Sequence, residues 1–325
     1  MLPLAASIFV YESLSAGIGS HGRGDAPGLD MLAMGEAMRD AVVADLLALK
    51  IYHVCVATAK ADAPAPAHGV APRDGEAAAD FVRRHARAHD LVWAIAPETA
   101  DELAGLHDCA RPEQWIGCEP RAIRLATRKH ATLAALAAAG LATPLAFEHA
   151  AQIERWVVKP DDGAGAIATR VHRQRPSAWN DWHARTGAGD AAVMEPWIEG
   201  EPLSLSLLCG RTHCELLSIN RQQLHVGPDG SLSFLGVQVQ AVPLTDARAA
   251  VLAALATRVH RAMPGLRGFV GVDLVWHPAY GPVVIEVNPR VTCAYVGLSR
   301  ALGRNLAGDA IAAASSAPRT ACSDA

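Results

Sequence analysis

The stretch 268–292 constrains the fold of this chain more than any other. It holds two apolar, β-branched runs, Gly271–Trp276 and Val283–Val287, separated by His-Pro-Ala-Tyr-Gly-Pro. That separating segment cannot continue a strand and suits a tight reversal, so the runs are predicted to pair as an antiparallel hairpin. A four-residue loop then sets a register in which three pairs face each other: Trp276 with Val283, Val275 with Val284, and Asp273 with Glu286.

The predicted pairing of Asp273 with Glu286 is unfavourable unless a cation joins it. Opposed residues have Cβ atoms ~4.5–5.5 Å apart, and their repulsion is ~1 kcal/mol in water and ~4 kcal/mol at an intermediate dielectric. Asn288 lies two residues past Glu286 and points to the same face. Two carboxylates and an amide oxygen form a hard-oxygen site that suits Mg²⁺. The alternative is an exposed edge where both carboxylates point to water.

Composition and charge describe an ordinary soluble protein. The 325 residues carry a formal charge of −4, with 19% charged and 51% hydrophobic residues. No basic stripe indicates a nucleic-acid partner. No run of 18 apolar residues indicates a membrane span, and the N-terminus lacks the basic region of a signal peptide. A cytoplasmic location is therefore expected. The seven cysteines show neither zinc spacing nor a CxxC pair, which favours buried thiols.

The first third of the chain alternates strands with helices, which predicts an open parallel sheet in an α/β lobe spanning residues 1–118. A glycine-rich stretch, 13–28, is interpreted as a loop lining a substrate cleft, with a plain surface loop as the alternative. The predicted strands are Leu4–Tyr11, Ile51–Thr58, Leu91–Ala96 and a fourth that ends at Trp115–Cys118, with a helix over Leu29–Leu49.

The next part, residues 119–195, carries two lysines at marked positions. Thr127 is expected to cap a helix whose start holds Lys129. A strand ends in Val-Val-Lys159-Pro and is followed by Asp-Asp-Gly-Ala-Gly-Ala at 161–166. Small residues let backbone amides approach an anion, beside which Lys159 would add positive charge. The alternative for Lys159 is a strand-end lysine that reaches solvent.

The last part, residues 196–325, starts at a carboxylate-rich bend, Glu195-Pro-Trp-Ile-Glu-Gly-Glu201. This bend resembles a hinge where a purine could lie beside Trp197, although Trp197 could equally serve packing. Strands follow before the hairpin, and a helix capped by Thr245 is expected to run to Met263. A short helix is expected around Gly297–Leu302.

These parts, in this order, resemble the ATP-grasp superfamily over roughly residues 119–310. The resemblance implies an N-terminal parallel-sheet α/β lobe followed by a two-lobed ATP-grasp fold, with ATP between the two α+β lobes. The domains are then 1–118, 119–195 and 196–325. By the same resemblance, Lys129 and Lys159 would contact the α- and β-phosphates, and the loop with Asp161, Gly163 and Gly165 would fold over the phosphates. Glu195, Trp197 and Ile198 would hold adenine, Glu201 would take the ribose hydroxyls, and Asp273, Glu286 and Asn288 would bind two Mg²⁺ ions, or Mn²⁺.

The family chemistry implies a ligase that forms an amide. The γ-phosphoryl group of ATP passes to a carboxylate, and an amine attacks the acylphosphate. Such transfer asks for positioning and charge neutralisation. Arg290 and Arg221 are the candidate catalytic cations, with a surface salt bridge as the alternative for Arg290. The D-alanine ligase branch has an arginine two residues before the first metal aspartate, and here that position is Gly271.

Within the superfamily, the chain looks most similar to the tyramine–glutamate ligases of methanofuran biosynthesis, a part of one-carbon metabolism. The carriers of this likeness are Phe9-Val10-Tyr11-Glu12, Ile219-Asn220-Arg221-Gln222 and the segment after Glu286. Glutamate would then be the carboxylate and tyramine or tyrosine the amine, with Thr292, Cys293 and Tyr295 near the acceptor. Another amino-acid or dipeptide ligase, and a non-catalytic ATP-binding regulatory protein, remain as alternatives. A homodimer is expected only by analogy with the family.

Overall fold

The computed structural model describes residues 6–18, 29–59, 66–150, 153–163 and 165–314. The N-terminal domain is a four-stranded parallel sheet in the order β3-β2-β1-β4, flanked by helices. Its elements are β1 (Ala6–Glu12), α1 (Leu29–Leu49), β2 (Tyr52–Ala57), β3 (His68–Val70), α2 (Ala78–Ala86), β4 (Leu91–Ile95), η1 (Thr99–Asp101) and α3 (Glu102–His107).

Both faces of this sheet are covered, which explains why its strands read as continuous apolar runs. Phe9 and Tyr11 on β1 pack toward Phe81 of α2, whereas Ile8 and Val10 pack on the opposite face with α1. The predicted parallel α/β lobe is confirmed, but the prediction that its fourth strand ends at Trp115–Cys118 is wrong. The fourth strand is β3, and Trp115 makes only an isolated parallel bridge with Val92 beyond β4.

The central lobe combines helices with a three-stranded antiparallel sheet in the order β6-β5-β7. Its elements are α4 (Pro120–Thr127), α5 (Lys129–Ala138), η2 (Pro144–Phe147), β5 (Trp156–Pro160), β6 (Arg170–His172), α6 (Arg175–Gly187) and β7 (Ala192–Pro196).

The helix α5 starts without the predicted Thr127 cap. The Thr127 hydroxyl instead donates to the carbonyl of Ile123, one turn back in α4. The free amides at the start of α5 are satisfied by Asp161: the amide of His130 donates to its Oδ1 at 2.9 Å, and the amide of Lys129 donates to its carbonyl at 2.8 Å. A carboxylate at a helix N-terminus also interacts favourably with the helix dipole.

The C-terminal lobe is built on a five-stranded antiparallel sheet in the order β10-β9-β8-β11-β12. Its helix α7 is capped by Asp246, which accepts from the amide of Arg248, so the predicted cap at Thr245 is one residue early. Its elements are β8 (Glu201–Cys209), β9 (Cys214–Val226), β10 (Leu232–Val242), α7 (Ala247–Ala262), β11 (Gly268–His277), β12 (Gly281–Asn288), η3 (Cys293–Tyr295), α8 (Leu298–Leu302) and α9 (Leu306–Ala314).

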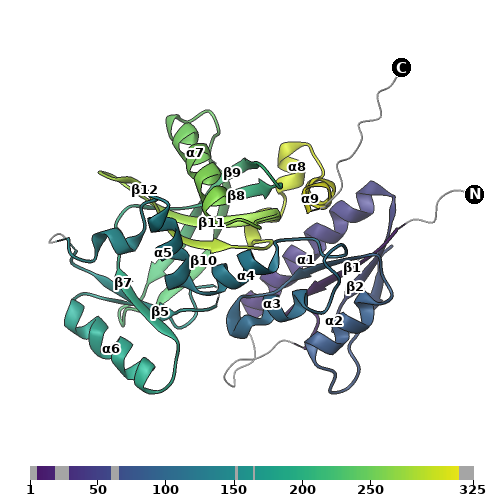
Figure 1. Cartoon of the computed structure of the whole chain (residues 1–325), viewed down its shortest axis with the longest axis horizontal. Coiled ribbons are helices and arrows are strands. Elements are labelled where there is room, and N and C mark those ends of the chain that lie inside the picture. Colours follow the sequence, from purple (N-terminus) through teal and green to yellow (C-terminus); the bar gives the residue numbers. More distant parts are fainter. Residues whose placement is uncertain (1–5, 19–28, 60–65, 151–152, 164, 315–325) are drawn as a thin grey trace, which may run out of the picture.

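The end of the described chain returns to its beginning. Figure 1 shows the last helix, α9, beside α1, with α6, β5 and β7 of the central lobe at the far end of the molecule. Residues of α1, β1 and β2 share one hydrophobic cluster with Phe269 of β11, Tyr295 and α9. The N-terminal domain and the C-terminal lobe therefore pack on a common core. Among the described residues, no helix has the length and apolar character needed to cross a membrane.

Candidate active site

The β11–β12 hairpin brings Asp273 directly opposite Glu286, as predicted. The loop and the register of the hairpin differ from the prediction. The loop is one residue tighter than expected, with His277 opposite Gly281 and Val275 opposite Val283. The predicted pairs of Trp276 with Val283 and of Val275 with Val284 are therefore wrong. A bulge between Asp273 and Leu274 leaves an extra residue on β12, which restores the pairing of the carboxylates.

The electrostatics at Asp273 reflect this crowding. Burial of the carboxyl and the charge of Glu286 raise the pKa of Asp273 to about 7, while hydrogen bonds from Asn288 and Gln222 and the charge of Arg290 oppose the rise. The amide of Asn288 donates from Nδ2 to Asp273 Oδ2 at 3.2 Å. Gln222 was not singled out from the sequence, although its alternation with Asn220 along β9 places it on the Asp273 face.

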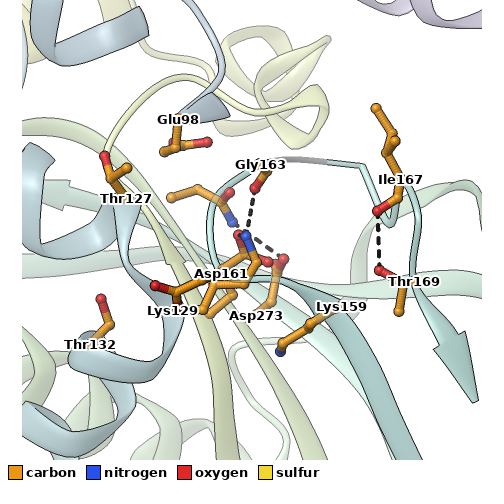
Figure 2. Close-up of polar contacts among 12 residues, drawn as sticks. Glu98, Thr127, Lys129, Thr132, Lys159, Asp161, Gly163, Ile167, Thr169 and Asp273 are labelled. Carbon is orange, nitrogen blue, oxygen red and sulfur yellow. Dashed lines mark hydrogen bonds and ion pairs between the residues drawn. The ribbon is translucent and has the colours of Figure 1, made fainter. Parts of the chain in front are cut away.

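Lys129 joins this carboxylate pair to the central lobe. Its Nζ lies 3.0 Å from Glu286 Oε1 and donates to the carbonyl of Gly163 at 2.6 Å. Burial lowers the pKa of Lys129, but the charge of Glu286 and its hydrogen bond outweigh this and raise the pKa overall. Figure 2 shows Lys129 and its hydrogen bond to the carbonyl of Gly163, with Asp161 and Asp273 in the same view. The ammonium thus supplies part of the positive charge that two opposed carboxylates require.

Arg290 contacts the N-terminal domain. Its Nε and Nη2 donate to the two carboxylate oxygens of Glu98, both at 3.0 Å, and Glu98 is 1% exposed. The pair is therefore a buried, bidentate salt bridge rather than a surface one. Glu98 follows β4 directly, and its only signal in the sequence is a charge after a buried strand. The carboxyl ends of parallel strands are where such sheets place functional groups.

The loop after β5 touches both neighbouring regions. Asp162 Oδ2 accepts from the amide of Ala100 in η1 at 2.8 Å. Gly163 and Gly165 have φ of +114° and +73°, a conformation that favours glycine. The side chain of Asp161 is engaged at the start of α5, so its role here is to cap that helix. The carbonyl of Gly163 faces Lys129, which places this loop next to the carboxylate pair.

Lys159 and Glu195 form an ion pair within the central sheet. Nζ of Lys159 lies 2.5 Å from Glu195 Oε1, and both side chains are more than 90% buried. The two residues come from the neighbouring strands β5 and β7. The predicted alternative of a solvent-reaching Lys159 is wrong.

The bend after β7 places Trp197 and Ile198 between lobes. The guanidinium of Arg155 lies 5.2 Å from the centre of the Trp197 ring. Ile198 is buried with Phe147 and Val283. A Cβ on the neighbouring Gly200 would lie 2.3 Å from the carbonyl oxygen of Trp276, so only glycine fits where this bend meets β11. The bend is thus anchored on the strand that carries Asp273.

Glu201 and Arg221 lie on the other face of the C-terminal sheet. Glu201 Oε1 accepts from Arg221 and its Oε2 accepts from Arg248 at 2.6 Å. These two guanidinium groups outweigh the effect of burial and lower the pKa of Glu201. Arg221 pairs in register with Leu203, which faces α7, whereas Asp273 belongs to the opposite alternation. The structure therefore does not bring Arg221 to the carboxylate pair.

The segment after Asn288 explains the glycine at 271. A Cβ at Gly271 would lie 2.7 Å from Cγ2 of Thr292, so a larger residue would displace this segment. Tyr295 is buried, and its hydroxyl donates to Asp45 of α1 at 2.6 Å, which makes it part of the domain contact. Burial and the charge of Asp273 raise the pKa of Cys293 to about 11, so this thiol stays protonated at neutral pH.

The carboxylate pair fits a magnesium site by its chemistry. Asp273 and Glu286 each offer carboxylate oxygens, and Asn288 an amide oxygen, all from one hairpin. Hard oxygen ligands of this kind suit Mg²⁺, which keeps other positions for water and phosphate. Burial first, and then the charge of Glu286, raise the pKa of Asp273, and a bound cation would oppose both effects. Two cations act on this cluster: Lys129 contacts Glu286, and the charge of Arg290 acts on Asp273.

Comparisons with known proteins agree with this arrangement. The ATP-grasp domain family matches residues 126–294, and the pre ATP-grasp 3 domain matches residues 51–123. No curated protein matches the sequence. Since the first match covers more than half of the 325 residues, the chain belongs to the ATP-grasp family.

Solved structures share the fold at low identity. An ATP-grasp superfamily protein from Archaeoglobus fulgidus superposes with a TM-score of 0.68 at 21% identity, covering 94% of this chain and 88% of that one. An L-amino acid ligase from Bacillus licheniformis gives 0.65 at 18% identity, covering 95% and 73%. A D-alanine–D-alanine ligase from Bacillus anthracis gives 0.64 at 14% identity, covering 95% and 97%. The mixed α/β fold with its parallel N-terminal sheet is thereby confirmed.

Proposed function

We propose that this ATP-grasp ligase joins a carboxylate to an amine at the expense of ATP, through an acylphosphate. The observation that carries the proposal is the Asp273–Glu286–Asn288 cluster, faced across the lobes by Lys129. Mg²⁺, when bound there with ATP, would neutralise charge on the phosphates. ATP-grasp enzymes use ATP with magnesium, and solved relatives include one with magnesium ADP.

The chain's own residues would then divide the work by position. Lys129 would turn from Glu286 toward a phosphate, because its ammonium already lies where negative charge gathers. Lys159 would add a second cation at the end of β5. Arg290, held by Glu98 at the junction of two domains, would face the acyl group as charge develops during transfer. Phosphoryl transfer needs this kind of positioning and neutralisation and no covalent residue of the protein.

For substrates, we infer glutamate as the carboxylate and tyramine or tyrosine as the amine, in methanofuran-like cofactor biosynthesis. Support comes from the likeness of the Tyr11-Glu12 and Arg290–Tyr295 segments to that group of ligases. The carboxyl ends of β1 and β2 gather Glu12, Ser13, Ser15 and Thr58, all at most 3% exposed. Buried polar groups at this edge of a parallel sheet suit recognition of a small polar molecule.

A second candidate is another amino-acid or dipeptide ligase. The specific observation in its favour is the common fold with an L-amino acid ligase and a D-alanine–D-alanine ligase over 95% of this chain. Against a non-catalytic ATP-binding protein stands the retention of Asp273, Glu286, Asn288 and both lysines.

The deciding experiment measures ADP release with Mg-ATP against a panel of amino acids and amines. Release that requires glutamate together with tyramine or tyrosine supports the first candidate, and mass spectrometry should show the γ-glutamyl amide. Release with a different pair rejects it in favour of the second. ATP binding without turnover across the panel would favour the non-catalytic protein.

A further inference from the structure

A second cluster of ligand-type side chains lies in the N-terminal domain, away from the carboxylate pair. The thiol of Cys55 and one ring nitrogen each of His85 and His89 lie within 4.8 Å of one another. Cys55 stands in the middle of β2, His85 in the last turn of α2, and His89 just after it. Cys55 and His85 are buried and His89 is partly buried. None of these residues belongs to the site proposed for ATP.

The ring of His89 is held in an orientation that suits metal binding. Its Nδ1 lies 2.8 Å from the carbonyl oxygen of His85, which can only accept a hydrogen bond. The neutral ring therefore carries its proton on Nδ1 and exposes a lone pair on Nε2. A backbone carbonyl that fixes the tautomer in this way is the usual outer partner of a metal-binding histidine.

The ring of His85 is also held in place. It stacks on Phe9 with ring centres 4.4 Å apart and planes 15° apart, and Phe81 meets its edge at 4.8 Å. Nη1 of Arg84 lies 3.2 Å from Nε2 of His85. Because arginine can only donate, the lone pair of this nitrogen accepts from Arg84, and zinc would take the place of Arg84 there. Arg84 is separately held by both carboxylate oxygens of Glu76, so it keeps a partner and a neutralising charge if His85 binds elsewhere.

His68 completes the set. It lies opposite Cys55 in the parallel register of β2 and β3, and opposed residues of neighbouring strands point to the same face. Its side chain is exposed and its charge acts on His85. A thiol and imidazoles are nitrogen and sulfur ligands of the kind that zinc prefers, and the strand register makes His68 the candidate for a fourth.

We propose that Cys55, His85 and His89, with His68 as fourth ligand, form a zinc site that joins β2, β3 and the end of α2. Tetrahedral zinc with bonds of ~2.3 Å to sulfur and ~2.0–2.1 Å to nitrogen needs closer ligand atoms than 4.8 Å. The cluster would close by about an ångström on binding, which rotation of the partly buried His89 and the exposed His68 permits. The ion would stabilise the edge of the N-terminal sheet and leaves the ATP chemistry unchanged.

The alternative is that the rings of Phe9, Phe81, His85 and His89 form a packed aromatic group beside a buried thiol. The two interpretations differ in one measurable property. A packed group has no affinity for zinc, whereas the proposed site binds one ion per chain through a thiolate.

The test uses the full chain without a polyhistidine tag, stripped with a chelator and titrated with zinc alone. We expect one zinc per chain by mass spectrometry after dialysis, and a higher melting temperature. Cobalt in place of zinc should give a thiolate-to-metal charge-transfer band and the visible bands of a tetrahedral ion. Absence of zinc, or of the thiolate band in the cobalt protein, overturns the proposal whatever the variants do.

Variants locate the site. Cys55→Ser and His89→Gln should each weaken zinc binding by at least ~100-fold, and His68→Ala by less, because water can replace an exposed ligand. Cys109→Ser is the matched control, since this thiol of the same domain accepts from Arg83 and donates to Gly105 outside the cluster. It should bind zinc like the unaltered protein. Equal zinc binding by Cys55→Ser and Cys109→Ser would overturn the proposal.

Discussion

Two lysine–glutamate pairs in this molecule, each with a buried lysine, look alike but differ in their surroundings. Lys159 and Glu195 come from adjacent strands of one sheet, so their contact does not depend on where the lobes lie. Lys129 and Glu286 come from different lobes, and Glu286 has a second carboxylate opposite it. The first pair is complete in itself, whereas the second has fewer positive than negative charges. A pair that lacks charge can be rearranged by a cation, and this is what a metal–nucleotide site requires.

The largest effect is expected at the incomplete pair. Glu286→Gln should lower ATP turnover by at least ~10³-fold, because it removes a metal ligand worth several kcal/mol in the transition state. The measurement is ADP release with the substrate pair that the panel identifies, accompanied by circular dichroism to confirm an intact fold. A folded variant that retains activity within tenfold of the unaltered protein contradicts the metal assignment.

At the complete pair, a loss of stability should accompany the loss of the second cation proposed for the phosphates. Lys159→Met leaves the carboxylate of Glu195 buried without its partner, which typically costs ~3–5 kcal/mol. Chemical denaturation should show this loss to the same extent with and without Mg²⁺. Glu195→Gln with Lys159→Met together should lose less than the single lysine variant, because no charge then stays buried. An additive loss in the double variant would argue against the ion pair.

Lys129→Met provides the direct contrast. In the absence of metal it should destabilise the fold by ~1–3 kcal/mol, because Glu286 then faces Asp273 without a cation. Addition of Mg²⁺ should recover part of this loss, since the ion takes over the neutralising charge. Thermal melts at several Mg²⁺ concentrations measure the recovery. If Mg²⁺ stabilises Lys129→Met no more than Lys159→Met, the distinction between the two pairs is wrong.

The smallest effect is expected at the exposed Arg221. Arg221→Ala removes one of two guanidinium partners of Glu201, and an exposed ion pair contributes ~0.2–1 kcal/mol. Arg248 remains to hold Glu201. Turnover should change by less than about tenfold, as Arg221 lies on the face of the sheet opposite Asp273. If Arg221→Ala lowered turnover as much as Glu286→Gln, Arg221 would have to act in the catalytic site after all.

Local patterns in the sequence predicted those parts of the site that one hairpin supplies. Asp273, Glu286 and Asn288 follow from strand alternation and a single reversal, and the small error in loop length is offset by a bulge. Residues 161–166 were predicted to fold over the phosphates, and the structure adds that the side chain of Asp161 caps α5, a contact between residues 31 positions apart. Alternation along β9 could have separated Arg221 from Gln222, because neighbouring residues of a strand face opposite ways.

Contacts between segments that are distant in the sequence could not be predicted from local patterns. Glu98 and Arg290 are 192 positions apart, and nothing local distinguishes Glu98 from an ordinary charge at a helix start. The strand β3 has three residues within a segment rich in Ala, Pro and Gly, too short for a periodic signal. His85 and His89 have the H-x₃-H spacing of zinc ligands, but Cys55 comes from a strand whose packing on the helix sets its distance from them, so no linear pattern includes the cysteine.

The shared core of α1, α9 and Phe269 has a mechanical consequence. The N-terminal domain and the C-terminal lobe are expected to move as one unit. Separating them would expose Val43, Tyr295 and their apolar neighbours to water. Within the central lobe, β5 and α6 have their own small apolar cluster around Trp156, whereas α4 and α5 share the core of the other two parts. Access to the nucleotide site would then be governed by movement of this small sheet and α6 against a fixed base.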